Sequence, residues 1–312
     1  MRIVYFISSN FPYETVIYSG VGPRFARSFG WPIEPISSIL EVQCDAGIID
    51  GRLTAEDMEK IDEFLAAPRK MSFPIFFRLS DPDMPTYSGE GDKYVFRKKD
   101  MPGVHYVSIY EPEGPLLEFV GSLQRSRVVR LPYPFDASKQ VQRDFSQRTR
   151  RIFLSGAQSR TLYPLRYSLH RKRRWNPLAR LAVAELRHPG YPESGRPPRH
   201  AIVHERFIVH AAGFTHFFLC PLRYRVELMK YVECGYAGCV PIGQPPKSLA
   251  DHVRHCFLPY SGSTLELLRA IFAGREEMAE IAAEYGRIMR ELRDPRRLHA
   301  ALEEQIRAMA IL

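Results

Sequence analysis

The sequence contains little that marks a secreted, metal-binding or membrane-spanning protein. Its five cysteines are an odd number and form neither a Cys-x-x-Cys pair nor a zinc-ligand spacing. No run of about 18 apolar residues is present to span a bilayer, and the apolar stretch at residues 3–7 is too short for a signal-peptide core. We therefore expect reduced core thiols, no bound metal and a cytoplasmic location.

The residues that are present predict an α/β protein with two domains. The chain has 312 residues, 45% hydrophobic and 25% charged, which is enough for two domains of ordinary size. Short apolar segments alternate with helical ones, as in a parallel sheet. A proline-rich stretch at residues 132–136 suggests a boundary. We predict two Rossmann-like domains, at residues 1–135 and 136–265, followed by C-terminal helices at 266–312 that pack back on the body.

The first half offers two aspartates at a strand end. An apolar strand at residues 73–79 stops at Ser80, Asp81, Pro82 and Asp83, and ligands of open α/β sheets bind outside the carboxyl ends of the strands. Asp81 and Asp83 are therefore candidates for an acceptor-side base. Aspartate and proline are also common turn residues, so a structural turn is the alternative interpretation.

His105 is the third candidate for a base. It is the only histidine before residue 170, and so the only imidazole that the first half can supply. It lies within a strand pattern at residues 103–109, where a half-buried structural histidine is the alternative.

The second half begins with an apolar strand at residues 151–154 that ends in Ser155, Gly156 and Ala157. Small residues after a strand allow backbone N–H groups to approach an anion closely. Either Arg160 or Arg166 lies near enough in the sequence to add a guanidinium, whose planar fork suits phosphate oxygens.

A second strand–helix junction carries a lysine and a glutamate. A short amphipathic helix begins near Lys230, stops at Gly238 and runs directly into the apolar strand at residues 240–242. Its free N–H groups favour an anion, Lys230 adds a cation, and Glu233 offers an acceptor for ribose hydroxyls. The alternative is one ordinary αβ unit of a doubly wound domain.

The order of these short motifs resembles the C-terminal half of bacterial group 1-like glycosyltransferases of the GT-B fold. The motifs are Ser-Gly-Ala at 155–157, Tyr-Pro-Leu-Arg at 163–166, His-Pro-Gly-Tyr at 188–191 and Lys-Tyr-Val-Glu at 230–233. The likeness covers residues 150–260 and does not reach the N-terminal half. It implies a transferase that takes a nucleotide sugar as donor, with no cofactor and no metal. It also implies these donor-binding residues: Ser155, Gly156, Arg160, Arg166, His188, Lys230 and Glu233.

One departure from the family limits what the resemblance implies. Many retaining members carry two glutamates eight positions apart, but eight positions before Glu233 stands Arg225. Glu233 aligns with the glutamate that faces the ribose, so the stereochemical outcome stays open. A non-catalytic binding or partner subunit of the same fold is therefore an alternative, and a basic nucleic-acid-binding protein is a further one.

The net charge of +9 calls for an acidic partner or an anionic surface. Its densest source is the run Arg171, Lys172, Arg173 and Arg174 on the helix after the first small-residue loop. Three interpretations of this run are considered. It is a helix face that contacts only solvent, a surface that binds anionic lipid or a lipid-linked acceptor, or a surface that binds nucleic acid. Nothing resembles a nucleic-acid-binding motif, so we expect a glycan or lipid-linked acceptor, with peripheral contact at the inner face of the membrane.

Overall fold

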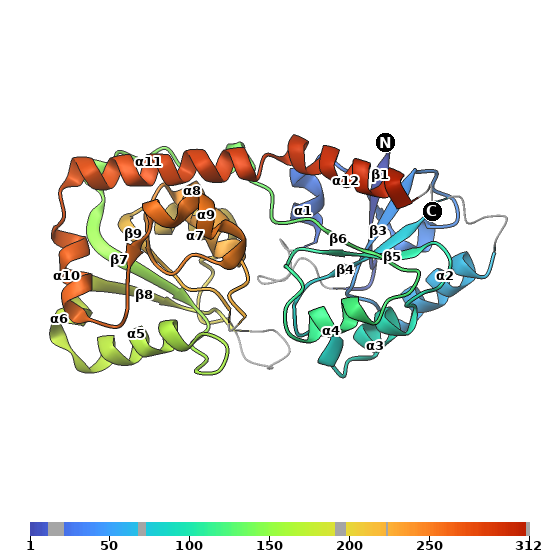
Figure 1. Cartoon of the computed structure of the whole chain (residues 1–312), viewed down its shortest axis with the longest axis horizontal. Helices are drawn as coiled ribbons and strands as arrows, with labels where there is room; N and C mark the ends of the chain where they lie inside the picture. Colours follow the sequence, from blue (N-terminus) through green and yellow to red (C-terminus); the bar gives the residue numbers. More distant parts are fainter. Residues whose placement is uncertain (12–21, 68–72, 191–197, 223, 310–312) are drawn as a thin grey trace. The chain divides into compact units, whose positions relative to one another are not determined.

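The computed structural model of the chain describes residues 1–11, 22–67, 73–190, 198–222 and 224–309. Contacts within the chain define two compact units. Unit 1 contains Met1–Pro134 together with Pro295–Leu312, and unit 2 contains Phe135–Asp294. Each unit is built on a parallel sheet, and Figure 1 shows both. None of the described helices is long and apolar enough to cross a membrane.

Unit 1 is a parallel sheet with helices around it. The strand order is β2-β1-β3-β4-β5-β6. The strands are β1 (Ile3–Ile7), β2 (Ile33–Pro35), β3 (Ala46–Asp50), β4 (Ile75–Leu79), β5 (Val104–Ser108) and β6 (Val128–Arg130). The helices are α1 (Pro23–Ser28), α2 (Ala55–Leu65), α3 (Glu90–Arg97), α4 (Pro115–Gly121) and α12 (Pro295–Met309).

Local sequence signals explain where elements of unit 1 begin. Thr54 forms a capping box with Asp57, since its side chain accepts from the Asp57 N–H and Asp57 accepts from the Thr54 N–H. The last helix, α12, belongs to this unit because Trp31 Nε1 lies 2.8 Å from His299 Nδ1 and because Leu302 is buried. The first unit is therefore made from two separate stretches of the chain.

Unit 2 has the strand order β11-β10-β9-β7-β8, again parallel. The strands are β7 (Thr149–Gly156), β8 (Val183–Arg187), β9 (Phe214–Leu219), β10 (Val240–Gly243) and β11 (Leu258–Pro259). The helices are α5 (Pro164–Trp175), α6 (Pro177–Ala182), α7 (His204–Ala211), α8 (Met229–Ala237), α9 (Ala250–Val253), α10 (Thr264–Phe272) and α11 (Arg275–Leu292).

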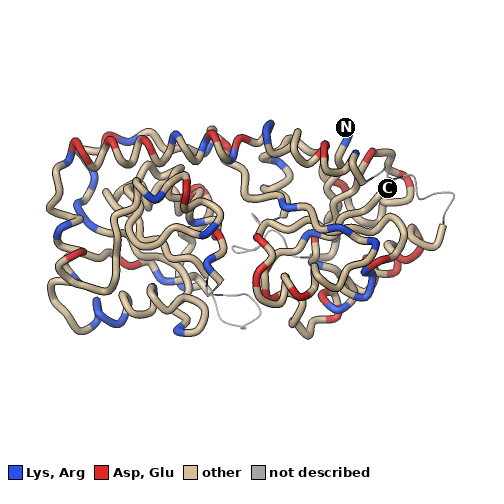
Figure 2. Tube along the Cα trace, in the orientation of Figure 1, with Lys and Arg blue, Asp and Glu red and all other residues tan. Residues whose placement is uncertain are grey.

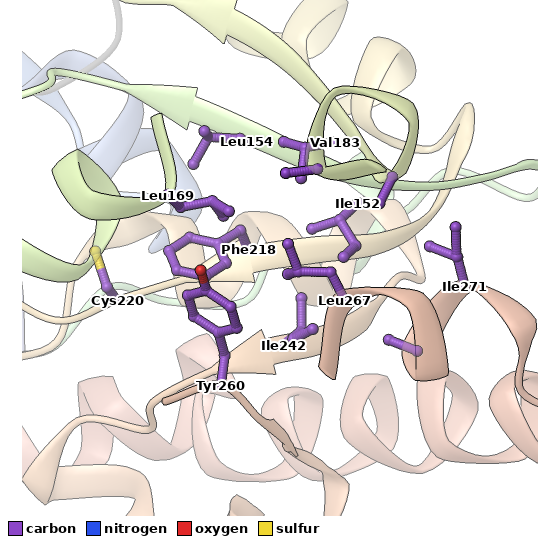
Figure 3. Close-up of a cluster of buried hydrophobic side chains, with 13 residues drawn as sticks. Ile152, Leu154, Leu169, Val183, Phe218, Cys220, Ile242, Tyr260, Leu267 and Ile271 are labelled. Carbon is purple, nitrogen blue, oxygen red and sulfur yellow. The ribbon is translucent and has the colours of Figure 1, made fainter. Parts of the chain in front are cut away.

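A hydrophobic cluster joins this second sheet to its helices. Figure 3 shows Ile152 and Leu154 of β7 together with Leu169 of α5, Phe218 of β9 and Leu267 of α10. Every one of these side chains is buried. The cluster packs the middle of α5 and of α10 against the sheet.

The sequence predicted the junction after α8 correctly. Gly238 ends α8 in the left-handed conformation, with φ 60° and ψ 41°, and β10 begins two residues later. All five cysteines are free thiols in the structure; four are buried and Cys44 is half-buried.

Candidate functional site

Three elements of unit 2 bring a glycine and two cations together at the carboxyl edge of the sheet. Gly156 ends β7, Arg166 lies in the first turn of α5, and Lys230 lies in the first turn of α8. A Cβ atom on Gly156 would stand 2.9 Å from Arg166 Nη1 and 3.1 Å from Lys230 Cε. Gly156 has φ +100°, a backbone conformation that favours glycine, and the neighbouring Arg166 and Lys230 leave little space for a side chain.

Arg166 is buried beside unsatisfied polar atoms. Only 2% of its surface is exposed, its Cζ lies 4.2 Å from the centroid of the Tyr163 ring, and its Nη1 donates to the Ala157 carbonyl at 3.4 Å. Within the described residues, Arg166 Nε and the buried Ser155 Oγ have no hydrogen-bond partner. Buried polar atoms without partners are costly, so acceptor oxygens of a ligand would satisfy this arrangement.

Lys230 and Glu233 form a neighbouring pair on α8. Lys230 Nζ lies 3.6 Å from Glu233 Oε2 and 4.3 Å from the centroid of the Phe207 ring. Burial lowers the pKa of the Lys230 ammonium, Glu233 opposes that shift and Arg166 adds to it. The site therefore holds more positive charge than its single carboxylate balances.

His188 follows β8 and belongs to the same surroundings. Its pKa is lowered by burial and by nearby cations, chiefly Lys230, so the imidazole is neutral at pH 7. Its Nδ1 accepts from the Gly190 N–H at 3.1 Å. Arg160 differs from the other predicted residues because it is exposed in the turn before α5. Of the two arginines considered for phosphate oxygens, Arg166 is the one beside Gly156.

This arrangement can bind a diphosphate and a diol. Arg166 and Lys230 supply two cations, and no side chain caps the start of α8, where N–H groups favour an anion. Glu233, 13% exposed at its side chain, offers carboxylate oxygens one helical turn from Lys230. Within the described chain, no group of three or more His, Cys, Asp or Glu side chains could hold a metal.

Cys220 is a part of this site that the sequence did not indicate. It follows β9, is 2% exposed and hydrogen-bonds with Arg166. Burial raises the pKa of its thiol, so the group is uncharged. Glu227, the other glutamate near Glu233, is engaged elsewhere: its Oε2 lies 2.5 Å from Arg293 Nη2 in a buried ion pair.

In unit 1 the three predicted bases do not lie together. Asp81 and Asp83 follow β4 at the carboxyl edge of the sheet, where Asp81 Oδ1 accepts from the Asp83 N–H at 2.8 Å, as in a turn. His105 lies near the start of β5, at the amino edge. Its Nδ1 accepts from the Arg127 N–H at 3.2 Å, and its ring stacks on Phe76. The structure thus separates His105 from the two aspartates.

A buried charged cluster in unit 1 was not predicted. Asp50 ends β3 and accepts from Tyr5 Oη at 2.8 Å, from Arg52 Nη1 at 3.1 Å and from the fully buried Arg78 Nη1 at 3.4 Å. The Arg78 Cζ also lies 5.0 Å from the centroid of the Phe25 ring. Because β4 is otherwise an apolar strand, the sequence did not indicate that Arg78 belongs to a charged cluster.

The basic run of α5 divides into two kinds of residue. Lys172 donates to the Gly262 carbonyl, and Arg173 donates to the Val183 carbonyl and pairs with the buried Glu185 at 3.1 Å. Arg171 and Arg174 are exposed. Only half of the predicted surface cluster is therefore available to a partner.

The chain has the GT-B fold, as the resemblance predicted. It is similar over 99% of its length to HepE from Anabaena in complex with UDP and glucose (all of that chain, 11% identity, TM-score 0.56). It is similar over 99% to an α-glucosyltransferase in complex with UDP and a 13-mer DNA that contains an HMU base (99% of that chain, 10% identity, TM-score 0.64). It also matches, over 99%, the N-terminal domain of trehalose-6-phosphate phosphatase from Candida albicans (97% of that chain, 9% identity, TM-score 0.55). No family model and no curated protein matches the sequence.

Proposed function

We propose that this protein is a glycosyltransferase that moves a sugar from a nucleoside diphosphate sugar to an acceptor hydroxyl. The observation that carries the proposal is the meeting of Gly156, Arg166 and Lys230 at the carboxyl edge of the second sheet. The GT-B fold and the UDP bound in two similar structures support it, and they make UDP the first nucleotide to test.

In the proposed reaction, Arg166 and Lys230 stabilise the leaving group. The acceptor oxygen attacks the anomeric carbon, the bond from that carbon to the diphosphate oxygen breaks, and the nucleoside diphosphate leaves with the bonding electrons. The negative charge that grows on the diphosphate is met by the two cations and by the N–H groups at the start of α8. We propose that these groups make a metal or a cofactor unnecessary.

Glu233 and His188 complete the proposed donor site. Glu233 accepts hydrogen bonds from the ribose hydroxyls, and its short distance from Lys230 supports a ribose bound beside the diphosphate. His188 is neutral, so it serves as a hydrogen-bonding group and not as a third cation. Ser155 Oγ, which has no partner within the described residues, donates to a phosphate oxygen.

The acceptor side of the proposal rests on Asp81 and Asp83. They lie at the carboxyl edge of the first sheet, the edge at which ligands of open α/β sheets bind. A substrate hydroxyl bound there needs a base that takes its proton. We propose a glycan or a lipid-linked glycan as acceptor, in the synthesis of cell-surface polysaccharide. Asp81→Asn and Asp83→Asn are compared for kcat, and a folded variant that retains full turnover would remove its aspartate from the role of base.

The first test is a thermal-shift panel of UDP, GDP, ADP, CDP and TDP. A ligand at 100 times its Kd stabilises the folded state by about 2.7 kcal/mol, so one nucleotide is expected to raise the Tm clearly. An unchanged Tm with all five at saturation would contradict the donor site.

The second test separates a transferase from a binding subunit. Radiolabelled sugar transfer from the matching nucleotide sugar is measured with soluble glycans, lipid-linked glycans and duplex DNA. DNA is included because one similar structure contains it. Nucleotide binding without transfer to any acceptor, and without hydrolysis of the donor, would favour the non-catalytic subunit.

A further inference from the structure

We propose that unit 2 carries a membrane-docking face, formed by neighbouring helices α5, α6 and α10, that binds anionic lipid bilayers. Large apolar side chains on these helices are exposed, and Figure 1 shows α6 and α10 at one end of the unit, with α5 running along its side toward them. The exposed fractions are 70% for Trp175, 51% for Leu178, 61% for Leu181, 63% for Leu265 and 72% for Phe272. Exposed apolar side chains gathered in one place mark an interaction surface.

The three helices hold these side chains on adjoining stripes. Trp175 shares its face of α5 with Arg171, three to four residues away, and Leu265, Arg269 and Phe272 follow a helical spacing along α10. Asn176, at the start of α6, hydrogen-bonds to Thr264, at the start of α10, at 3.4 Å.

The far ends of α6 and α10 are also held near each other. Arg151 donates to the Arg180 carbonyl at 2.9 Å, and the adjacent Arg150 donates to the Ile271 carbonyl at 2.7 Å. Ala179 and Ala182 of α6 pack in the same buried cluster as Ala270 and Ile271 of α10, so the two helices lie side by side. Leu178 and Leu181 therefore neighbour the stripe of α10.

The charge of this face is one-sided. The sequences of α5 and α6 contain no acidic residue, and α10 contains only Glu266, which is occupied in the capping box with Ser263. Figure 2 shows the Lys and Arg residues along α5. The exposed cations among the apolar side chains are Arg171, Arg174, Arg180 and Arg269. Glu276 and Glu277, the next exposed acids along the chain, belong to the start of α11.

A lipid surface fits this combination better than the other partners. A second copy of the chain on the same face would place arginine against arginine, because a two-fold interface pairs the same patch with itself. Nucleic acid would use the arginines but leave Leu178, Leu181 and Phe272 without a role. Anionic headgroups attract the arginines, while Trp and Leu side chains enter the boundary with the acyl chains.

This face differs from the surface that the sequence predicted. Lys172 and Arg173 have structural contacts, so a variant that removes the whole basic run would also disturb the fold. The docking cations are spread over three helices, and the apolar anchors come from residues far apart in the sequence. The proposal does not depend on the proposed transferase activity.

The test is co-sedimentation of the full chain with vesicles of phosphatidylcholine and phosphatidylglycerol at 3:1. Changing Arg171, Arg174, Arg180 and Arg269 to Gln should weaken binding about fivefold for each arginine. The matched control neutralises four exposed cations of unit 1: Arg97, Lys99, Arg125 and Arg127. Equal loss in both variants would show attraction by net charge alone and would overturn the proposal.

A second set of variants tests the apolar anchors. Changing Leu178, Leu181 and Phe272 to Ser should abolish the binding that remains at 0.5 M salt, where the electrostatic attraction is screened. The control changes Leu117 and Val209, each 54% exposed, to Ser. Circular dichroism and Tm confirm that each variant is folded. If the wild type loses all binding at high salt, apolar side chains are not inserted. The same conclusion follows if the anchor variant keeps the binding that remains at high salt.

Trp175 gives a direct readout. The chain has two tryptophans, and Trp31 is buried with its Nε1 bonded to His299. In a Trp31→Phe background, the emission of Trp175 should shift to shorter wavelength on vesicles and be quenched by brominated lipids. An emission that neither shifts nor is quenched would overturn the proposal. So would a concentration-dependent dimer that forms without vesicles and that the anchor variant abolishes. Binding to duplex DNA but not to vesicles would also overturn it.

Discussion

Burial lowers the pKa of Lys230 and so disfavours its charge, and this makes its removal informative. Lys230→Ala is expected to raise the barrier for transfer by about 2–4 kcal/mol, the usual effect of losing one group that stabilises developing charge. The measurement is kcat with saturating donor. Arg254→Ala removes an exposed cation as the control. Unaltered turnover in a folded Lys230→Ala protein would place Lys230 outside the site.

The lowered pKa of Lys230 predicts a pH dependence. A diphosphate binds the charged form, and the folded protein gives up this proton at a lower pH than an ordinary lysine does. Nucleotide affinity should therefore fall as the pH rises through the pKa of folded Lys230, before an ordinary lysine would titrate. Isothermal calorimetry from pH 7 to pH 10 measures this fall. Lys230→Arg, which stays charged over this range, should flatten it, and an unchanged profile in that variant would point to another group.

Gly156 allows the two cations to meet. Gly156→Ala would place a methyl group 2.9 Å from Arg166 Nη1 at φ +100°, so both the backbone and the cations must shift. We expect nucleotide affinity to fall tenfold or more. Gly262→Ala is the matched control, because Gly262 has φ +117° but open space around it. If both variants bind equally well, the close approach at Gly156 has no role in binding.

At the scale of elements, Asp50 links strands β1, β3 and β4 through Tyr5 and Arg78. Asp50→Asn leaves Arg78 buried without its closest counter-charge and should cost about 3–5 kcal/mol. Burial opposes ionisation of Asp50, but Arg52 and Arg78 hold its pKa below the ordinary value. The contribution of Asp50 to the free energy of unfolding is therefore complete above the pKa that this residue has in the unfolded chain. It is lost as the pH falls through the lower pKa of Asp50 in the folded protein.

Urea denaturation measures this effect. The double variant Asp50→Asn/Arg78→Met removes the stranded charge and should recover part of the lost stability. Glu63→Gln, which breaks the exposed pair with Lys60, is the control and should leave the midpoint unchanged. A midpoint for Asp50→Asn equal to that of wild type would mean that the cluster does not stabilise the sheet.

Elements with strong local signals were predictable from the sequence. The helix end at Gly238 is confirmed, and the capping box at Thr54 is a signal of the same kind, because capping and turn chemistry depend on neighbours in the chain. The small-residue end of β7 and the start of α8 were likewise read as two halves of one site. The missed parts depend on distant contacts, because the pairing of Asp50 with Arg78 joins two strands. The exposed face formed by α5, α6 and α10 could not be predicted as one surface because three separate helices contribute to it.

At the scale of the whole molecule, the proposed donor residues all belong to one continuous stretch of chain. Ser155, Arg166, Lys230 and Glu233 lie within Phe135–Asp294, which has its own buried core. We expect residues 135–294, expressed alone, to fold and to bind the nucleotide recognised by the full chain, with no transfer. Two-dimensional NMR with added nucleotide measures both properties. A folded fragment that does not bind, beside a full chain that does, would show that unit 1 contributes to nucleotide binding.

The placement of α12 has a consequence for the order of folding during synthesis. Unit 2 is one contiguous stretch of chain, so it is complete as soon as its last residue, Asp294, leaves the ribosome. Unit 1 begins with β1, before any residue of unit 2 is made, yet Trp31 receives its partner His299 only when α12 emerges after unit 2. Domains usually finish in the order in which they are translated, but here the domain that starts first must close last.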